Sequence, residues 1–129
     1  MRIDPGKSVG RLAIGMTREE YEAVVGTSDD VFKRTAEAPD FVVAYDDKLI
    51  HLTVDHARRI KSITVFRPEK VELDGIQLLG RDLASVTADL ARTAFSFLTV
   101  DAGLFSAEAG VLLVEHNGLI DGVEVTASS

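Results

Sequence analysis

The sequence predicts an α+β domain of two tandem repeats, each a helix followed by a four-stranded antiparallel meander, in a sheet with one open face. Three observations predict it: an internal repeat, helix-start motifs, and apolar runs separated by turn residues. A chain of 129 residues has ordinary single-domain length. We expect one domain over 8–127, with repeat one at about 8–68, repeat two at about 71–127, and frayed ends at 1–7 and 126–129.

The internal repeat emerges when the chain is aligned with itself at a shift of 60 residues. Leu52–Val65 then matches Leu112–Val125, with a leucine, a histidine, an isoleucine and two valines identical. A shift of 65 aligns Gly15 with Gly80. The two shifts agree if Ala36–Asp40 is a loop that the second copy lacks.

Each copy carries a helix-start signal after a short apolar segment and a glycine. Thr17-Arg-Glu-Glu20 is a capping box, in which the hydroxyl and the carboxylate each satisfy a backbone N–H. Gly26 supplies a left-handed stop, so the pattern predicts a helix over 18–25. In the second copy Asp82 is the predicted N-cap. Apolar residues then recur at three- and four-residue steps: Leu83, Val86, Leu90 and Ala94.

Four strands are expected after each helix, separated by turn residues such as Asn117-Gly118. Their predicted ranges are 31–35, 41–45, 49–54 and 60–66, then 95–100, 104–106, 111–115 and 119–125. Ile50, Leu52 and Val54 alternate with more polar residues and should face the core, which leaves the other face open to solvent. By the repeat, the matching open-face residues of the second copy are Ala109, Val111, Leu113 and Glu115.

The net charge of −7 comes entirely from the second half of the chain. Residues 1–68 hold eleven basic and eleven acidic residues, whereas residues 69–129 hold three basic and ten acidic ones. Such a field repels nucleic acid and favours a basic protein partner, although solubility alone would also explain it.

No cysteine is present, which excludes disulfides and thiolate metal sites. Residues 1–7 lack the apolar core of a signal peptide, and no apolar run approaches the ~18 residues of a membrane span. We therefore expect a cytoplasmic protein that does not associate with a membrane.

The histidines are the main candidates for chemistry. His56 and His116 match in the repeat, and Asp55 and Glu115 precede them, as in a metal site or an acid–base pair. Their shared position at a hairpin turn explains them without catalysis, and His51 should lie on the open face. The sequence has no nucleophile elbow and no complete phosphate loop. We expect no catalytic residue, no metal and no cofactor.

Two resemblances concern the architecture and one motif. A helix plus a four-stranded meander, twice in tandem, resembles the β-lactamase inhibitor proteins. Ile14–Glu20, with Gly26 after the helix, resembles the opening motif of small proteins related to the lipoprotein subunit of the outer-membrane β-barrel assembly machinery. The chain departs from both groups in having no cysteine. The resemblance implies a fold that binds other proteins through its sheet face and performs no chemistry.

Three functions are compatible with these patterns. The first is a non-catalytic protein-binding module, an immunity or inhibitor protein that occludes an enzyme through the open sheet face. The residues expected to contact the partner are Tyr45, His51, Phe105, Val111, Leu113, Glu115 and Glu124. The second is a small-molecule-binding domain or weak enzyme that uses His56, His116 and their neighbouring acids in a cleft between the repeats. The third is a structural subunit, such as a homodimer formed through the apolar second-half face or a free sheet edge.

Overall fold

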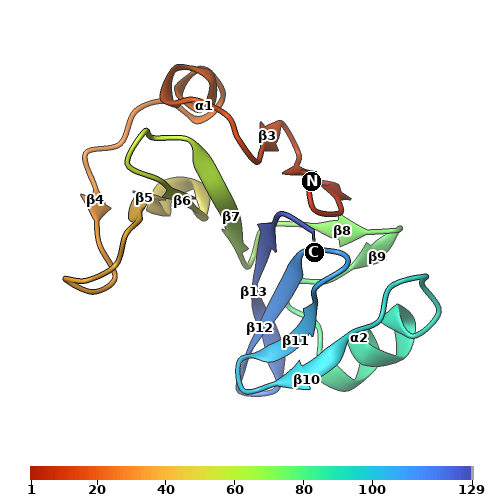
Figure 1. Cartoon of the computed structure of the whole chain (residues 1–129). Coiled ribbons are helices and arrows are strands. Elements are labelled where there is room, and N and C mark those ends of the chain that lie inside the picture. The colour runs from red at the N-terminus through yellow and green to blue at the C-terminus, as the bar shows by residue number, and fades with distance from the viewer. Residues whose placement is uncertain (129) are drawn as a thin grey trace.

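The computed structural model describes residues 1–128, and its centre is one antiparallel sheet of eight strands. The strands are β4 (Val31–Phe32), β5 (Phe41–Tyr45), β6 (Ile50–Val54), β7 (Ile60–Phe66), β10 (Leu98–Val100), β11 (Gly103–Ser106), β12 (Val111–His116) and β13 (Leu119–Thr126). Their order across the sheet is β10-β11-β12-β13-β7-β6-β5-β4 (Figure 1). The sheet therefore has β4 and β10 as its two edges.

Shorter elements surround this sheet. β1 (Ile3–Asp4), β2 (Ser8–Val9) and β3 (Leu12–Ala13) form a three-stranded sheet, and β8 (Glu72–Leu73) and β9 (Ile76–Gln77) form a two-stranded one. The helices are α1 (Arg18–Val25) and α2 (Leu83–Leu90), with a 3₁₀ turn, η1, at Asp46–Lys48. None of the helices described between residues 1 and 128 is long and apolar enough to cross a membrane.

The predicted fold class, two α+β repeats of a helix and a four-stranded meander, is wrong. The structure is mostly β: 41% of it is strand and 15% is helical, in two short α-helices and the 3₁₀ turn η1. The physical reason is that β7 pairs directly with β13, over Ser62–Phe66 and Gly122–Thr126. This pairing joins strands from both parts of the chain into one large sheet, to which two further small sheets are added.

The alignment at a shift of 60 also places β12 in the wrong register. Leu52 faces Ile63 across its strand pair, and the residue that faces Val123 in the same way is Leu113, not Leu112. Five residues lie between the paired Val54 and Ile60, but only four lie between the paired Glu115 and Ile120. Because successive side chains of a strand point to opposite faces, this one-residue difference reverses the expected faces of β12.

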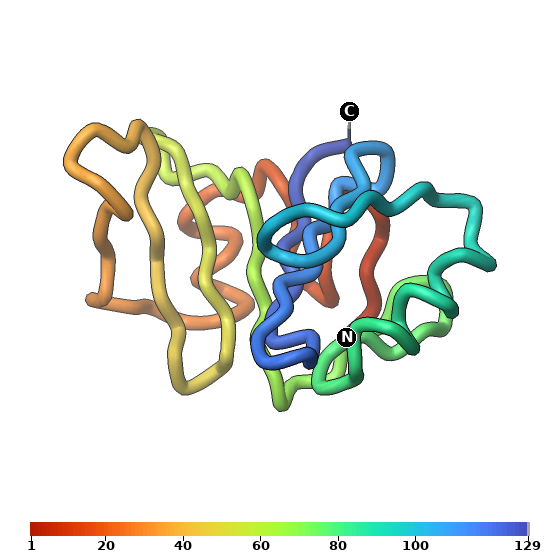
Figure 2. The backbone as a smooth tube through the Cα atoms, turned by 90° about the horizontal axis from the view of Figure 1, so that it is seen from below, coloured from red at the N-terminus to blue at the C-terminus, as the bar shows by residue number. Residues whose placement is uncertain are grey.

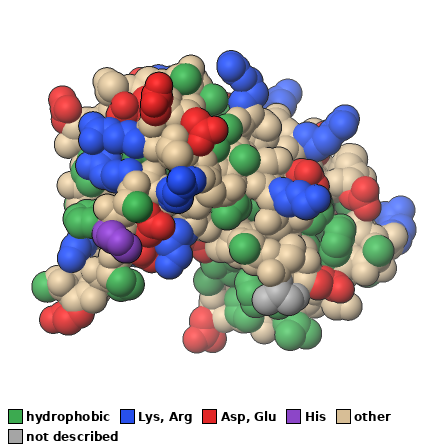
Figure 3. All heavy atoms as spheres, turned by 45° about the horizontal axis from the view of Figure 1, so that its top comes forward, with side chains coloured by type: hydrophobic (Ala, Val, Ile, Leu, Met, Phe, Trp, Pro, Cys, Tyr) green, Lys and Arg blue, Asp and Glu red, His purple; other side chains and the backbone are tan. Residues whose placement is uncertain are grey.

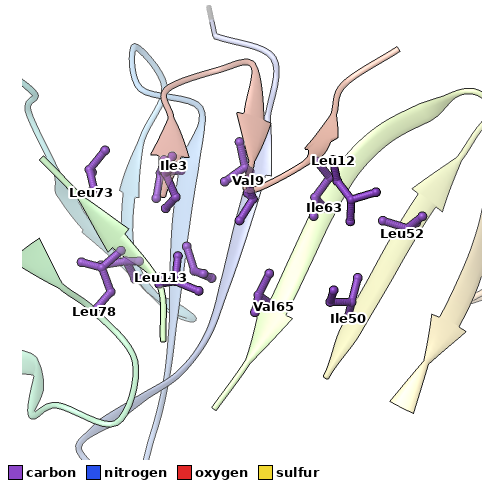
Figure 4. Packing of buried hydrophobic residues seen from close by; sticks show 14 of the residues in the cluster. Ile3, Val9, Leu12, Ile50, Leu52, Ile63, Val65, Leu73, Leu78 and Leu113 are labelled. Carbon is purple, nitrogen blue, oxygen red and sulfur yellow. The ribbon is translucent and has the colours of Figure 1, made fainter. Parts of the chain in front are cut away.

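One face of the large sheet carries the core. Figure 1 shows α1, α2 and the two small sheets on that same side. Tyr21 of α1 and Leu90 of α2 are buried there against apolar side chains of the strands. In Figure 4 Leu113 lies beside Leu78, and Leu52 beside Ile63, so both parts of the sheet contribute to one core.

The predicted helix starts are confirmed. The Thr17 hydroxyl accepts a hydrogen bond from the Glu20 N–H, and the Glu20 carboxylate accepts one from the Thr17 N–H at 3.0 Å. Asp82 caps α2 by accepting from the Ser85 N–H at 2.9 Å. Gly26 ends α1 with φ at 83°. These motifs are local, which is why the sequence alone predicts them.

The expected fraying at 1–7 is wrong. Ile3 is buried in the core and pairs with Val9, and the N-terminal ammonium donates a hydrogen bond to the Lys70 carbonyl at 2.7 Å. At the other end, β13 continues to Thr126, and Ser129 lies outside the described residues.

Candidate binding face

The second face of the large sheet, here the free face, is not covered by any element of residues 1–128. In Figure 2 the yellow strands β5 and β6 lie in front of α1, with the free face toward the viewer. The residues of the free face follow from the strand registers. From edge β4 to edge β10 they are Phe32, Val42, Ala44, His51, Thr53, Ser62, Thr64, Phe66, Gly122, Glu124, Thr126, Leu112, Val114, Gly103, Phe105, Leu98 and Val100.

The free face is concave. Val42 and Ala44 are buried, with Val42 only 1% exposed, yet neither belongs to the core cluster. Thr64, on a central strand, is 8% exposed. No helix or strand of residues 1–128 lies over these side chains, and Figure 1 shows the large sheet bent around this face. Figure 3 shows a hollow in the surface between the two lower lobes of the molecule.

The half of the free face formed by β10, β11 and β12 is apolar. Leu98, Phe105 and Leu112 lie opposite one another in a row across these strands. Val100 and Val114 lie in the next row, on either side of Gly103. We call these five side chains (Leu98, Val100, Phe105, Leu112 and Val114) the apolar patch. Leu98 is 68% exposed and Val100 37% exposed, so the patch reaches solvent at the sheet edge.

Two glycines lie beside the apolar patch, in the same row as Val114. Gly103 has φ at +151°, and a Cβ there would clash with the Leu113 carbonyl oxygen. Gly122 lies on the other side of Val114 and faces Phe66, whose ring would be 3.4 Å from a Cβ at Gly122. Both glycines are buried, so the Leu113 backbone and the Phe66 ring already occupy the space that a side chain would take at these two positions.

The segment that carries the apolar patch contains acidic residues and no basic one. Residues 98–126 contain five Asp or Glu and no Lys or Arg. Asp121 pairs with Arg67 at 2.7 Å, but in the described chain Asp101, Glu108, Glu115 and Glu124 form no ion pair. The patch thus combines exposed apolar surface with uncompensated negative charge.

The remaining half of the free face is more polar. The His51 Nε2 lies 2.8 Å from Asp46 Oδ1, and its ring meets that of Phe66 edge-to-face, with centroids 4.9 Å apart. Near the centre, the Ser62 hydroxyl donates to the Glu124 carboxylate at 3.2 Å. These contacts hold the polar side chains in place and give the two halves distinct chemistry.

Three of the seven predicted contact residues lie on the free face: His51, Phe105 and Glu124. Glu115 is half-buried at the irregular end of β12, where its carboxylate accepts a hydrogen bond from the Gly118 N–H. Glu115 therefore stabilises a turn beside the patch.

Tyr45, Val111 and Leu113 are buried in the core, so the expected open-face position of Val111 and Leu113 is wrong. Val111 and Leu113 were assigned to the open face by the mistaken register, as was Ala109, which is also buried. Tyr45 donates its hydroxyl hydrogen to the Gly26 carbonyl at 2.9 Å, and burial raises the pKa of Tyr45 to about 12.

Sequence reasoning missed Leu98, Val100, Leu112 and Val114. The run Val111-Leu-Leu-Val114 is apolar at every position, so alternation cannot reveal which pair faces the core. The signal that could have located this surface is the absence of Lys and Arg throughout 98–126.

The structure does not bring His56 and His116 together. Both are exposed, and they lie at the turns before β7 and before β13. Because β7 and β13 are antiparallel, these turns are at opposite ends of the sheet, roughly 30 Å apart at the rise of a strand. No group of three or more His, Cys, Asp or Glu in residues 1–128 could hold a metal. The prediction that the two histidines share a cleft is therefore wrong.

Comparison with known proteins finds no match to a protein family, to a curated protein or to a solved structure. The resemblances noted in the sequence stay predictions. The free face and its side chains are therefore the features of the molecule that bear on function.

Proposed function

We propose that this chain is a non-catalytic protein-binding module that takes a basic protein partner on the β10–β13 half of its free face. Such a module would occlude its partner, as an inhibitor or immunity protein does. The observation that supports it is the apolar patch, which lies uncovered on a concave sheet face, in a segment whose Asp101, Glu108 and Glu124 form no ion pair among the described residues.

The apolar patch supplies a favourable free energy of association. Leu98 and Val100 are two of only four large hydrophobic side chains in the described chain that are exposed. Fully burying a side chain of this size contributes about 1.5–3 kcal/mol. Exposed apolar residues that cluster on one surface are typical of interaction sites, whereas scattered ones are not.

The unpaired carboxylates favour a basic partner. Asp101 and Glu108 lie in the turns at the two ends of β11, and Glu124 lies on the free face itself. Charges arranged in this way accelerate encounter with a protein of opposite charge and fix its orientation. Salt screens such charges over about 10 Å at 0.1 M, so association should weaken as salt increases.

Two variants of matched chemistry test the proposal. Leu98→Ser and Phe32→Ser each remove an exposed apolar side chain from the same face, at opposite edges of the sheet. Wild-type protein and both variants are used to capture proteins from source lysate at low salt, followed by quantitative mass spectrometry. The identified partner is then purified, and its dissociation constant is measured at several salt concentrations.

We expect Leu98→Ser to weaken binding at least about tenfold, as at an interface hot spot, and Phe32→Ser to leave it unchanged. Equal effects of the two substitutions, or binding that does not depend on salt, would contradict the proposal. A folded protein that repeatedly captures nothing would contradict it as well.

A further inference from the structure

The edge strand β10 is open to pairing. All three of its residues are exposed, and β11 is its only neighbour in the described sheet. The strand's backbone takes part in no further hydrogen bond among residues 1–128 beyond its pairing with β11. An edge of this kind presents unpaired N–H and C=O groups that a strand of another chain can bond.

Thr99 is the residue of β10 whose backbone N–H and C=O point away from β11. The Ala102 carbonyl accepts a hydrogen bond from the Glu115 N–H, on the β12 side of β11. Because successive residues direct their backbone groups to alternate neighbours, Gly103 and Phe105 direct theirs to Val100 and Leu98. Thr99, between these two, has its N–H and C=O on the outer edge.

The two edges of the sheet differ in their protection. β4 has only two residues and lies between Asp29-Asp30 and Lys33-Arg34. By contrast, β10 ends the uncharged run Ala94–Val100. Charged residues on or beside an edge strand oppose pairing with other chains. β4 has them on both sides, whereas β10 has none before it and only Asp101 after it, so β10 is the less protected edge.

We infer that a strand of the basic partner adds to β10 and extends the large sheet by one strand. This inference rests on the proposed function. Backbone groups of the added strand bond Thr99, and its alternate side chains continue the free face beside Leu98 and Val100. The added strand therefore alternates apolar residues, which face the apolar patch, with Lys or Arg.

Charge favours a basic partner over a second copy of this chain. Two copies paired through β10 would place two 98–126 regions together, each with five acidic residues and no basic one. Like charges brought together in this way oppose association. A strand with Lys or Arg is instead attracted by Asp101 and Glu108, in the turns at the two ends of β11.

The probe is a capped seven-residue peptide, Lys-Val-Lys-Val-Lys-Val-Lys, added to the full chain and followed by NMR. In the inferred register, valines lie beside Leu98 and Val100, and a lysine backbone bonds Thr99. One control peptide is methylated on the backbone amide nitrogens of its lysines, so these residues cannot donate a hydrogen bond to β10. Its matched control is methylated on the backbone amide nitrogens of the valines instead. It has the same side chains and charge and keeps the donors to β10.

We expect the unmodified peptide to slow exchange of the Thr99 amide hydrogen. Backbone methylation at the lysines should weaken binding about tenfold, because it removes the donors to β10. Backbone methylation at the valines should leave binding unchanged. Equal binding of the two methylated peptides would overturn the inference, as would binding of none of the three.

Substitutions at Thr99 give a second test with the natural partner. Thr99→Pro removes the outward N–H, whereas Thr99→Ala keeps it, and neither alters a side chain of the free face. We expect only Thr99→Pro to weaken binding. If Thr99→Pro unfolds the chain, the methylated peptides still decide the question.

The two proposals fail in different ways. Loss of partner binding in Leu98→Ser but not in Thr99→Pro would overturn strand addition and leave the proposed function standing. Binding that neither substitution affects would overturn both. Sedimentation is measured on the wild type and on Thr99→Pro. A dimer of the wild type that Thr99→Pro abolishes would assign the β10 edge to a second copy of this chain and would overturn the inference of a basic partner strand.

Discussion

The two halves of the large sheet share one core but present different free faces. In the half formed by β4–β7, the region 31–66 holds six basic and five acidic residues, and the free face carries polar side chains such as His51 and Thr64. In the half formed by β10–β13, the region 98–126 has no basic residue, and the apolar patch occupies the free face. Folding constrains the core side of both halves, so the two halves differ mainly on the free face.

The largest expected effect comes from testing which face β12 buries. Leu113→Ala should lower the free energy of unfolding by about 2–5 kcal/mol, because Leu113 is fully buried. Leu52→Ala, in the other half, should cost a similar amount. Leu112→Ala, one residue away on the free face, should cost less than about 1 kcal/mol. Urea denaturation measures all three, and equal costs for Leu112 and Leu113 would contradict the observed register.

Gly103→Ala should destabilise the β10–β13 half. A Cβ at Gly103 meets the Leu113 carbonyl oxygen, so the backbone must move, at a cost of about 1–3 kcal/mol. Gly118→Ala is the control: it also has positive φ, but a Cβ there meets nothing within 4 Å. Its cost should be no more than about 1–2 kcal/mol, from backbone strain alone. Thermal unfolding of the two variants should therefore rank Gly103→Ala as the less stable.

Alkaline pH should destabilise the β4–β7 half through Tyr45. The folded pKa of Tyr45, at about 12, lies above the ordinary value of 10. Its contribution to stability is therefore complete below pH 10 and is lost as the pH rises from 10 towards 12. In Tyr45→Phe this loss should disappear, and removing the hydrogen bond to Gly26 should cost about 1 kcal/mol at neutral pH. Unfolding measured between pH 8 and 12 should show both effects, and an unchanged pH dependence in the variant would contradict the assignment.

Acid should affect both parts of the chain to a small extent. Hydrogen bonds from the backbone hold the pKa of Asp55 and of Asp82 below the usual range, and Arg81 does the same for the pKa of Asp89. Stability from these groups is complete above the unfolded pKa of about 4 and is lost as the pH falls through the lower folded values. Asp55→Asn and Asp82→Asn should each flatten the stability profile below pH 4. A profile as steep as that of the wild type in both variants would contradict this origin.

The smallest effect on stability is expected on the free face. Leu98→Ser should change the free energy of unfolding by no more than about 0.5 kcal/mol, because the side chain lies largely in solvent. Urea denaturation checks this value beside the binding measurements. A large loss of stability would mean that Leu98 contributes to folding and would undermine its use as a probe of binding.

The parts of the fold that depend on neighbouring residues were predictable. The capping box at Thr17, the cap at Asp82 and the stop at Gly26 satisfy backbone groups within one turn of helix, so no distant residue is needed to identify them. The candidate site was predictable only in part. His51, Phe105 and Glu124 lie on the free face, as expected, whereas Val111 and Leu113 lie in the core. An entirely apolar run does not indicate which of its residues face the core.

By itself, the sequence determined where the helices start, roughly where the strands of the large sheet lie, and that all net charge falls in the second part of the chain. Only the tertiary structure decided that β7 pairs with β13, that Leu113 rather than Leu112 faces the core, and that β10 becomes an open edge. Strand pairing joins backbone groups far apart in sequence, and a shift of one residue reverses every side chain. Such pairing is a property of the assembled sheet, which no local pattern of residues specifies.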